Sequence, residues 1–136
     1  MPEPSKKLAS KQTLWLILLP MLATFVCQRL YLHLVRVRHV HAFGYLVHHL
    51  FFGILIELPA AFVLAFGPRS RWLAVAALIA LGIGSGMILD EVTYLVATKA
   101  TDGDYVSGLS LGGAIGFISL AVILLLTLYR CHRDEK

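Results

Sequence analysis

Apolar residues in this chain fall into four long runs that are separated by short polar segments. The runs cover residues 13–35, 42–66, 72–97 and 106–129. An α-helix needs about 20 predominantly apolar residues to cross a bilayer, so each run predicts one transmembrane helix. Transmembrane strands would instead appear as alternating segments of about ten residues. The pattern therefore predicts an all-α polytopic membrane protein, a four-transmembrane-helix bundle between a tail at residues 1–12 and a second tail at residues 130–136.

The composition agrees with this interpretation. Of the 136 residues, 58% are hydrophobic and 15% are charged, whereas soluble domains average about 25% charged residues. The mean hydropathy is +0.77. Lysines precede the first run, as they do in signal peptides, but no small-residue cleavage site follows its apolar core. We therefore expect the first run to be retained as a helix that contacts the lipid bilayer.

Lysine and arginine residues are distributed unequally between the two sides of the predicted bundle. Four crossings place both termini and the second connector on one side, with eight Lys and Arg residues against four on the other side. Because positively charged flanks face the cytoplasm, we expect cytoplasmic termini and a location in the inner membrane. The net charge of +4 follows from these flanks and calls for no nucleic-acid partner. Cys27 and Cys131 fall on opposite sides, so no disulfide is expected between them.

Ionisable residues lie inside two of the apolar runs. His48 and His49 stand near the start of the second run, and Asp90 and Glu91 stand near the end of the third. At about 1.5 Å of rise per residue, both pairs are expected at a similar depth near the extracytoplasmic face. A charge in hydrocarbon is costly unless it is paired, so such residues usually face the bundle interior and mark a functional site.

Glu57 lies deeper in the second run than the histidines. It is about 12 Å below His49 by helix rise, close to the bilayer midplane, and Pro59 follows it. A proline inside a span frees a backbone carbonyl one turn earlier and often marks a kink. Glu57 is expected either to be protonated, to bond to a neighbouring helix, or to take part in the polar site.

The first connector is rich in basic residues. Its histidines, including His33, His39 and His41, are expected to contact lipid headgroups, and its arginines, Arg29, Arg36 and Arg38, are expected to anchor the chain at the interface. His41 and His48 are seven residues apart and would share one helical face if the second helix began before His41.

Glycines recur at helical spacing in the last three runs. The third run carries Gly82, Gly84 and Gly86, the second carries Gly53, and the fourth carries several more. Small residues at this spacing let transmembrane helices approach closely. We therefore expect packing faces here, which would also permit a homo-oligomer.

Three segments, VHHLFFG, GIGSGMILDE and DGDYVSG, resemble in this order a family of small prokaryotic four-span membrane proteins. That family has an HxHHxxxG motif opening one span, an LDE motif closing the next span, and a DxYW-like loop after it. The match covers roughly residues 39–110. This chain departs from it with Leu46 where the first histidine of the family stands and with Val106 in place of tryptophan. The resemblance supports a shared polar site, with His41 as the substitute for the missing histidine, and names no chemistry.

Imidazole and carboxylate side chains together suit a divalent transition metal, and favour zinc, iron or manganese over copper(I). Adjacent histidines point about 100° apart on a helix, so one of them is expected to bind the metal and the other either to support that ligand or to act as a base. The candidate metal ligands are His49, Asp90, Glu57 and His41, and the candidate catalytic residues are His48 and Glu91. The candidate substrate contacts are Tyr94, Asp104 and Tyr105.

These residues leave three classes of function open. The first is a metal-dependent hydrolase or oxidase that acts on a lipid or lipid-linked substrate. The second is a metal or proton carrier, which would need a polar path below Glu57, where the runs are almost wholly apolar. The third is a non-enzymatic interaction or structural protein, which predicts direct bonds between the histidines and the carboxylates.

Overall fold

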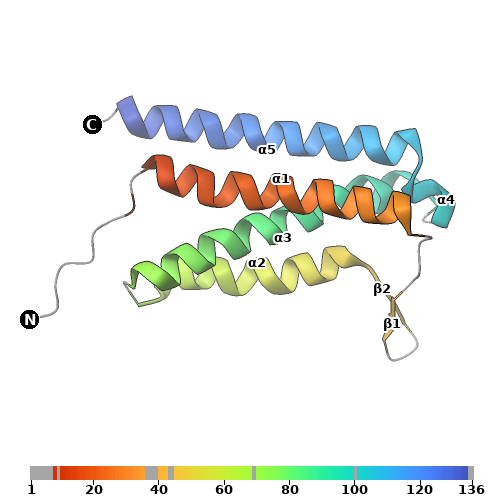
Figure 1. Cartoon of the computed structure of the whole chain (residues 1–136), viewed down its shortest axis with the longest axis horizontal. Coiled ribbons are helices and arrows are strands. Elements are labelled where there is room, and N and C mark those ends of the chain that lie inside the picture. The colour runs from red at the N-terminus through yellow and green to blue at the C-terminus, as the bar shows by residue number, and fades with distance from the viewer. Residues whose placement is uncertain are drawn as a thin grey trace, which may run out of the picture.

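The computed structural model of the chain describes residue 8 and residues 10–35, 40–42, 45–68, 70–99 and 101–134. Its elements in chain order are α1 (Ser10–Leu34), β1 (Val40–Ala42), β2 (Tyr45–Val47), α2 (His49–Phe66), α3 (Arg71–Ala97), α4 (Asp102–Tyr105) and α5 (Gly108–Asp134). Figure 1 shows the four long helices side by side.

Four of these helices, α1, α2, α3 and α5, are long and apolar enough to cross a membrane. The chain is therefore a multi-pass membrane protein, and the predicted all-α fold class is confirmed. The start of α1, the connection from α2 to α3 and the end of α5 lie at one end of the bundle, here called the terminal end (Figure 1). The strands and α4 lie at the opposite end, here called the hairpin end.

The second transmembrane helix begins at His49. The sequence predicted that it would begin at residue 42, so this boundary was wrong. The preceding residues form a short antiparallel hairpin, in which His41 pairs with Leu46. His48 is still extended, with φ −82° and ψ 146°, and the backbone N–H of Leu50 donates to Oε2 of Glu91 at 2.7 Å. The carboxylate on α3 satisfies one of the free N–H groups in the first turn of α2, which explains why the helix starts here.

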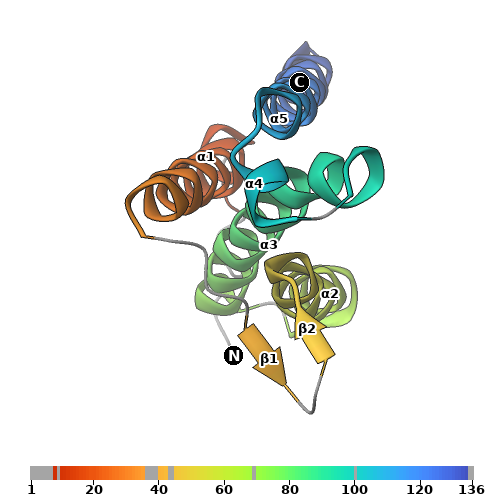
Figure 2. The same ribbon diagram turned by 90° about the vertical axis from the view of Figure 1, so that its right-hand side faces the viewer.

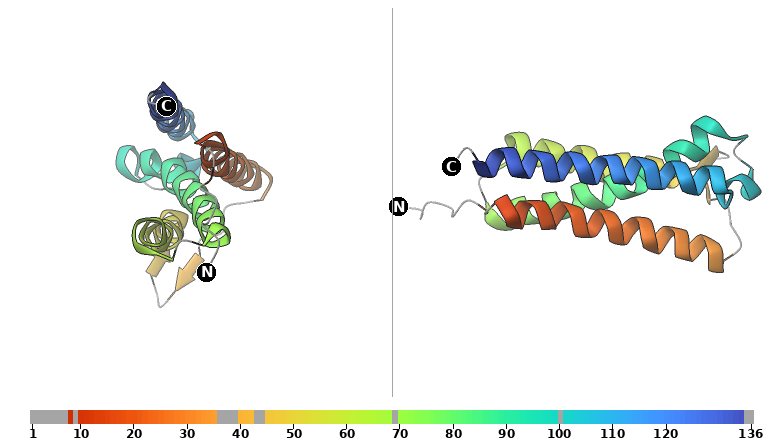
Figure 3. Two further views of the ribbon diagram at one scale, coloured as in Figure 1. Left: turned by 90° about the vertical axis from the view of Figure 1, so that its left-hand side faces the viewer. Right: turned by 90° about the horizontal axis from the view of Figure 1, so that it is seen from above.

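Helix α3 is the central element of the bundle. It packs against α1, α2 and α5, and the end-on view of Figure 2 places it among these three helices. The opposite end-on view in Figure 3 gives the same arrangement. The large apolar side chains that remain exposed lie mainly on the outer faces of the long helices, for example Phe62 on α2 and Leu120 on α5. In a membrane protein these faces contact lipid.

Glycines bring α3 close to both α1 and α2, as the sequence predicted. A Cβ atom at Gly84 would lie 2.7 Å from the carbonyl oxygen of Gly53, and one at Gly53 would lie 2.8 Å from that of Gly84. On the α1 side, a Cβ atom at Gly82 would clash with the backbone oxygen of Ile17. The glycines of α5 differ from one another. A Cβ atom at Gly113 would clash with the side chain of Thr93 on α3, whereas Gly112 and Gly116 have nothing within 4 Å of an added Cβ. Gly113 therefore belongs to a packing face, and Gly112 and Gly116 do not within the described chain.

Candidate functional site

A buried ion pair joins α1 to α3 at the hairpin end of the bundle. Nε of Arg29 donates to Oδ1 of Asp90, and Nη2 of Arg29 donates to the backbone oxygen of Asp90 at 2.9 Å. Arg29 is buried and Asp90 is 0% exposed. The prediction that Arg29 anchors the chain at the membrane interface is therefore wrong, because its side chain turns inward to a carboxylate that needs a charged partner.

The second carboxylate oxygen of Asp90 has partners of its own. The hydroxyl of Tyr105 donates to Oδ2 of Asp90, and Nε2 of His49 lies 3.2 Å from the same oxygen. Burial raises the pKa of the Tyr105 hydroxyl above its usual range, and the neighbouring carboxylate of Asp90 raises it further. Tyr105 therefore keeps its proton and stays a hydrogen-bond donor to Asp90.

Arg29 also forms hydrogen bonds to α4 and α5, in addition to its ion pair with Asp90. Its Nη1 atom donates to the backbone oxygen of Tyr105 at 2.9 Å, and its guanidinium carbon lies 4.6 Å from the centre of the Tyr105 ring. Its Nη2 atom donates to Oγ of Ser110 at 3.3 Å. One guanidinium therefore connects α1, α3, α4 and α5.

Glu91 holds both histidines and is itself buried. Its Oε1 atom lies 2.7 Å from Nδ1 of His48, and its Oε2 atom lies 3.3 Å from Nδ1 of His49. The predicted meeting of the two histidines with the two carboxylates is thus confirmed, and both members of each adjacent pair take part. These direct contacts are the ones that a non-enzymatic structural or interaction protein was expected to show. We call the group of Arg29, His48, His49, Asp90, Glu91 and Tyr105 the polar network.

The two histidines have different surroundings. Both ring nitrogens of His49 lie near carboxylate oxygens, whereas His48 contacts Glu91 through Nδ1. The side chains of His48 and His49 are 16% and 21% exposed, so neither ring is sealed inside the bundle. The network contains two carboxylates and one guanidinium in addition to the two imidazoles.

Two of the four predicted metal ligands, His49 and Asp90, meet in the polar network. The described residues contain no group of three or more His, Cys, Asp and Glu side chains placed to hold a metal ion. Both oxygens of Asp90 already accept from protein groups. Glu57 lies apart and accepts from Oγ of Ser85 on α3 at 3.3 Å, as one of the sequence alternatives predicted. The side chain of His41 lies outside the described residues.

The predicted substrate contacts also have structural partners. Tyr94 is buried, and its ring packs 5.1 Å from that of Tyr105 and 6.0 Å from that of His48. Asp104 caps α4, because Oδ2 accepts from Oγ1 of Thr101 at 2.8 Å and from its backbone N–H at 3.1 Å. The hydroxyl and backbone amide of Thr101 hold the pKa of the Asp104 carboxyl below its usual range. Asp104 thus has a capping role at α4.

Sequence reasoning missed Arg29 and Ser110 as members of this site. Arg29 carried a usable signal, since it lies inside the first apolar run. By helix rise, Arg29 lies about 9 Å from the predicted extracytoplasmic end of that run. His49 and Asp90 were expected at a similar depth below the same membrane face. Ser110 carried no such signal, because it contributes a hydroxyl and a backbone carbonyl to the guanidinium.

Comparisons with known proteins identify no relative of this chain. No family model matches the chain, no curated protein matches it, and no solved structure matches it. The resemblance suggested by the short motifs therefore stays a prediction, and the function has to be argued from the polar network.

Proposed function

We propose that His48 is the functional group of this membrane protein and that it acts as an acid or base on a lipid or lipid-linked substrate. The observation that carries the proposal is the 2.7 Å contact between Nδ1 of His48 and Oε1 of Glu91. A carboxylate that accepts from one ring nitrogen of a histidine fixes the ring and its tautomer. The other nitrogen, here Nε2, is then the one that takes or gives a proton.

The setting of His48 supports this role. Its side chain is partly exposed, whereas Glu91 behind it is buried, so a substrate can reach the ring while its orienting carboxylate stays out of water. Tyr94 packs against the ring from α3. A base held in one orientation removes a proton from a hydroxyl or water more effectively than a mobile one.

The location of His48 indicates the class of substrate. It directly precedes the first turn of α2, a helix that is long and apolar enough to cross a membrane, so we expect it near the lipid headgroups. The unequal distribution of Lys and Arg residues supports an extracytoplasmic position for the hairpin end. A substrate that diffuses within the membrane would therefore meet His48 from the lipid or from the headgroup layer.

The test uses the whole chain in nanodiscs made from the total lipid extract of its expression host. Wild type is compared with His48→Gln, and His33→Gln on α1 is the matched control. We expect mass spectrometry to find a lipid product that forms with wild type and with the control and is lost in His48→Gln. A wild type that changes no lipid, with His48→Gln altering only the melting temperature, would overturn the proposal in favour of a non-enzymatic structural or interaction protein.

A second candidate function is metal binding through His48 and His41. The register of the hairpin favours it, because the backbone of His41 pairs with Leu46, the position where the family motif has its first histidine. Metal-bound histidines commonly donate their other ring nitrogen to a carboxylate, as His48 could to Glu91. Zinc, iron or manganese remains the metal predicted for such a pair.

A further inference from the structure

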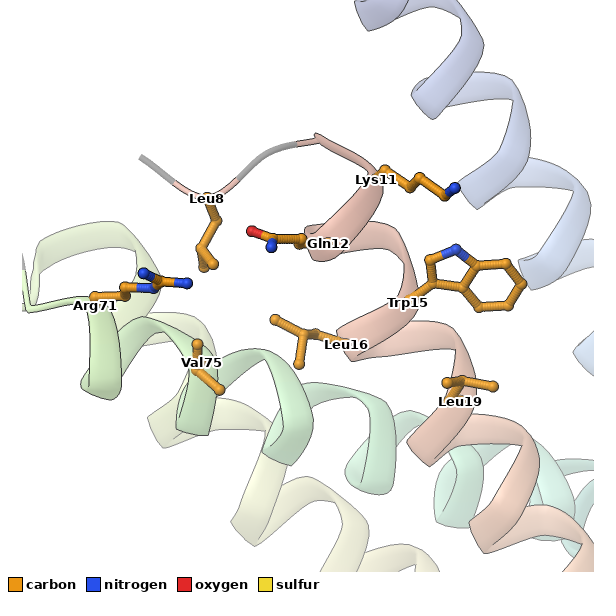
Figure 4. A pocket seen from close by; sticks show the side chains of 8 residues that line it. All are labelled: Leu8, Lys11, Gln12, Trp15, Leu16, Leu19, Arg71 and Val75. Carbon is orange, nitrogen blue, oxygen red and sulfur yellow. The ribbon is translucent and has the colours of Figure 1, made fainter. Parts of the chain in front are cut away.

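A groove lies at the terminal end of the bundle, whereas the polar network lies at the hairpin end. It has a volume of about 440 Å³ and lies between the first turns of α1 and α3 (Figure 4). Its apolar walls come from Leu8, Trp15, Leu16, Leu19 and Val75. Figure 4 shows Leu16 on α1 and Val75 on α3 pointing toward each other across the gap.

Two cations line this groove. Arg71 is the first residue of α3 and Lys11 is the second residue of α1. In Figure 4 the guanidinium of Arg71 reaches toward Leu8 and Gln12, whereas Lys11 extends from the other side of α1. Neither cation has a carboxylate partner within the described part of the chain.

The backbone adds positive potential at the same place. Both α1 and α3 begin at the groove, and neither helix has an acidic residue in its first turn. The first turn of a helix carries a partial positive charge from its unpaired N–H groups. Two such turns and two cations therefore lie at one groove whose walls are mainly apolar.

The tryptophans mark the level of this groove in the membrane. The chain has two tryptophans, and both lie near the start of a helix that borders the groove. Trp72 is in the first turn of α3, and Trp15 is in the second turn of α1. Trp15 lines the groove, and Trp72, which follows Arg71, is 83% exposed. Because tryptophan concentrates where the headgroups of a bilayer begin, the cations lie at headgroup level and the apolar walls lie below them.

We propose that this groove binds an anionic phospholipid. Its phosphate lies at Arg71 near the first turn of α3, and one acyl chain runs between Leu16 and Val75. Lys11 adds charge at the same level without being the main ligand. An anionic lipid matches the groove in charge at its mouth and in polarity along its walls, whereas a zwitterionic lipid adds a cationic group that Arg71 repels.

The test measures lipid retention by native mass spectrometry of the full chain in mixed micelles. The probes are dioleoylphosphatidylglycerol and dioleoylphosphatidylcholine. We expect wild type to retain the phosphatidylglycerol preferentially. Arg71→Gln should weaken its binding about fivefold, the effect typical of one basic residue beside anionic lipid, and leave phosphatidylcholine unchanged. Arg130→Gln on α5 removes a cation from the same end of the bundle, outside the groove, and should change neither lipid.

A second variant tests the apolar part of the groove. Leu19→Trp adds bulk at an exposed wall position without changing charge, and it should lower the retention of both lipids. Equal retention of the two lipids by wild type would overturn the proposal. So would an equal loss in Arg71→Gln and Arg130→Gln, which would indicate general attraction to positive charge, or retention that Leu19→Trp leaves unchanged. These outcomes are independent of the role proposed for His48.

Discussion

Glu91 and His48 are joined by a 2.7 Å contact between Oε1 and Nδ1, and the other oxygen of Glu91 accepts the backbone N–H of Leu50. One side chain on α3 therefore orients an imidazole and also determines where α2 begins. The two effects are linked, because a helix that started earlier would move His48 away from the carboxylate.

Replacing Glu91 by glutamine tests both effects at once. The amide keeps the shape of the side chain but removes the charge that both histidines face. We expect Glu91→Gln to lower the free energy of unfolding by about 1–3 kcal/mol, the cost typical of leaving buried polar groups poorly paired. Unfolding in mixed detergent micelles measures this change. Glu57→Gln is the control, since Glu57 is half-buried and accepts from Ser85 at 3.3 Å, and an equal effect of the two variants would contradict the prediction.

Removal of the guanidinium should be more severe. Arg29→Met leaves the fully buried Asp90 carboxylate without its cation, and breaking a buried pair in this way costs about 3–5 kcal/mol. The double variant Arg29→Met with Asp90→Asn removes both charges and should be more stable than Arg29→Met alone. If the double variant and Arg29→Met have the same free energy of unfolding, the prediction is contradicted, because the uncompensated charge of Asp90 would then not be the cause of the instability.

The close approach of α2 and α3 predicts a contrast between two glycines. Gly84→Ala places a methyl group 2.7 Å from the carbonyl oxygen of Gly53, so the helices must separate at a cost of about 1–3 kcal/mol. Gly112→Ala meets nothing within 4 Å and should be neutral or stabilising by up to about 1 kcal/mol through helix propensity. Thermal unfolding of both variants checks the contrast. The opposite order of stability would show that the two helices are not in contact at Gly84.

The cap of α4 should depend on pH. Thr101 holds the pKa of Asp104 below its ordinary value of 3.8, so the folded cap binds a proton less readily than the unfolded chain. Its contribution to stability is therefore present above pH 3.8 and is lost as the pH falls through the lower folded value. The chemical shift of the Thr101 amide should report this titration by NMR in micelles. It should be absent in Asp104→Asn, and a transition centred well above pH 3.8 would contradict the assignment.

Metal analysis decides the second candidate function. The protein is purified without chelator and loaded separately with zinc, iron or manganese. If His48 is a ligand, elemental mass spectrometry should find near-stoichiometric metal in wild type, less than half of it in His48→Ala, and an unchanged amount in His132→Ala, which lies near the end of α5. A wild type that takes up no metal would exclude the candidate and leave His48 with the acid–base role.

Hydropathy alone predicted the four long helices, because each run of apolar residues is long enough to cross a bilayer as a helix. Helix rise alone brought His48 and His49 to the level of Asp90 and Glu91. The hairpin before His49 could not be predicted in this way. The segment from Tyr45 to Phe52 is mostly apolar whether it is a strand or a helix, and the start of α2 depends on Glu91, far away in sequence. The role of Arg29 was missed because the first run does not reveal which side of its helix faces α3.

The separation of 61 residues between Arg29 and Asp90 has a consequence for biosynthesis. At about 5–20 residues per second, a ribosome needs about 3–12 s to extend the chain from Arg29 to Asp90, so Arg29 is made seconds before its counter-charge exists. We therefore expect the packing of α1 against α3 through this pair to form only after α3 has been made. A segment that is synthesised early would then reach its final packing late.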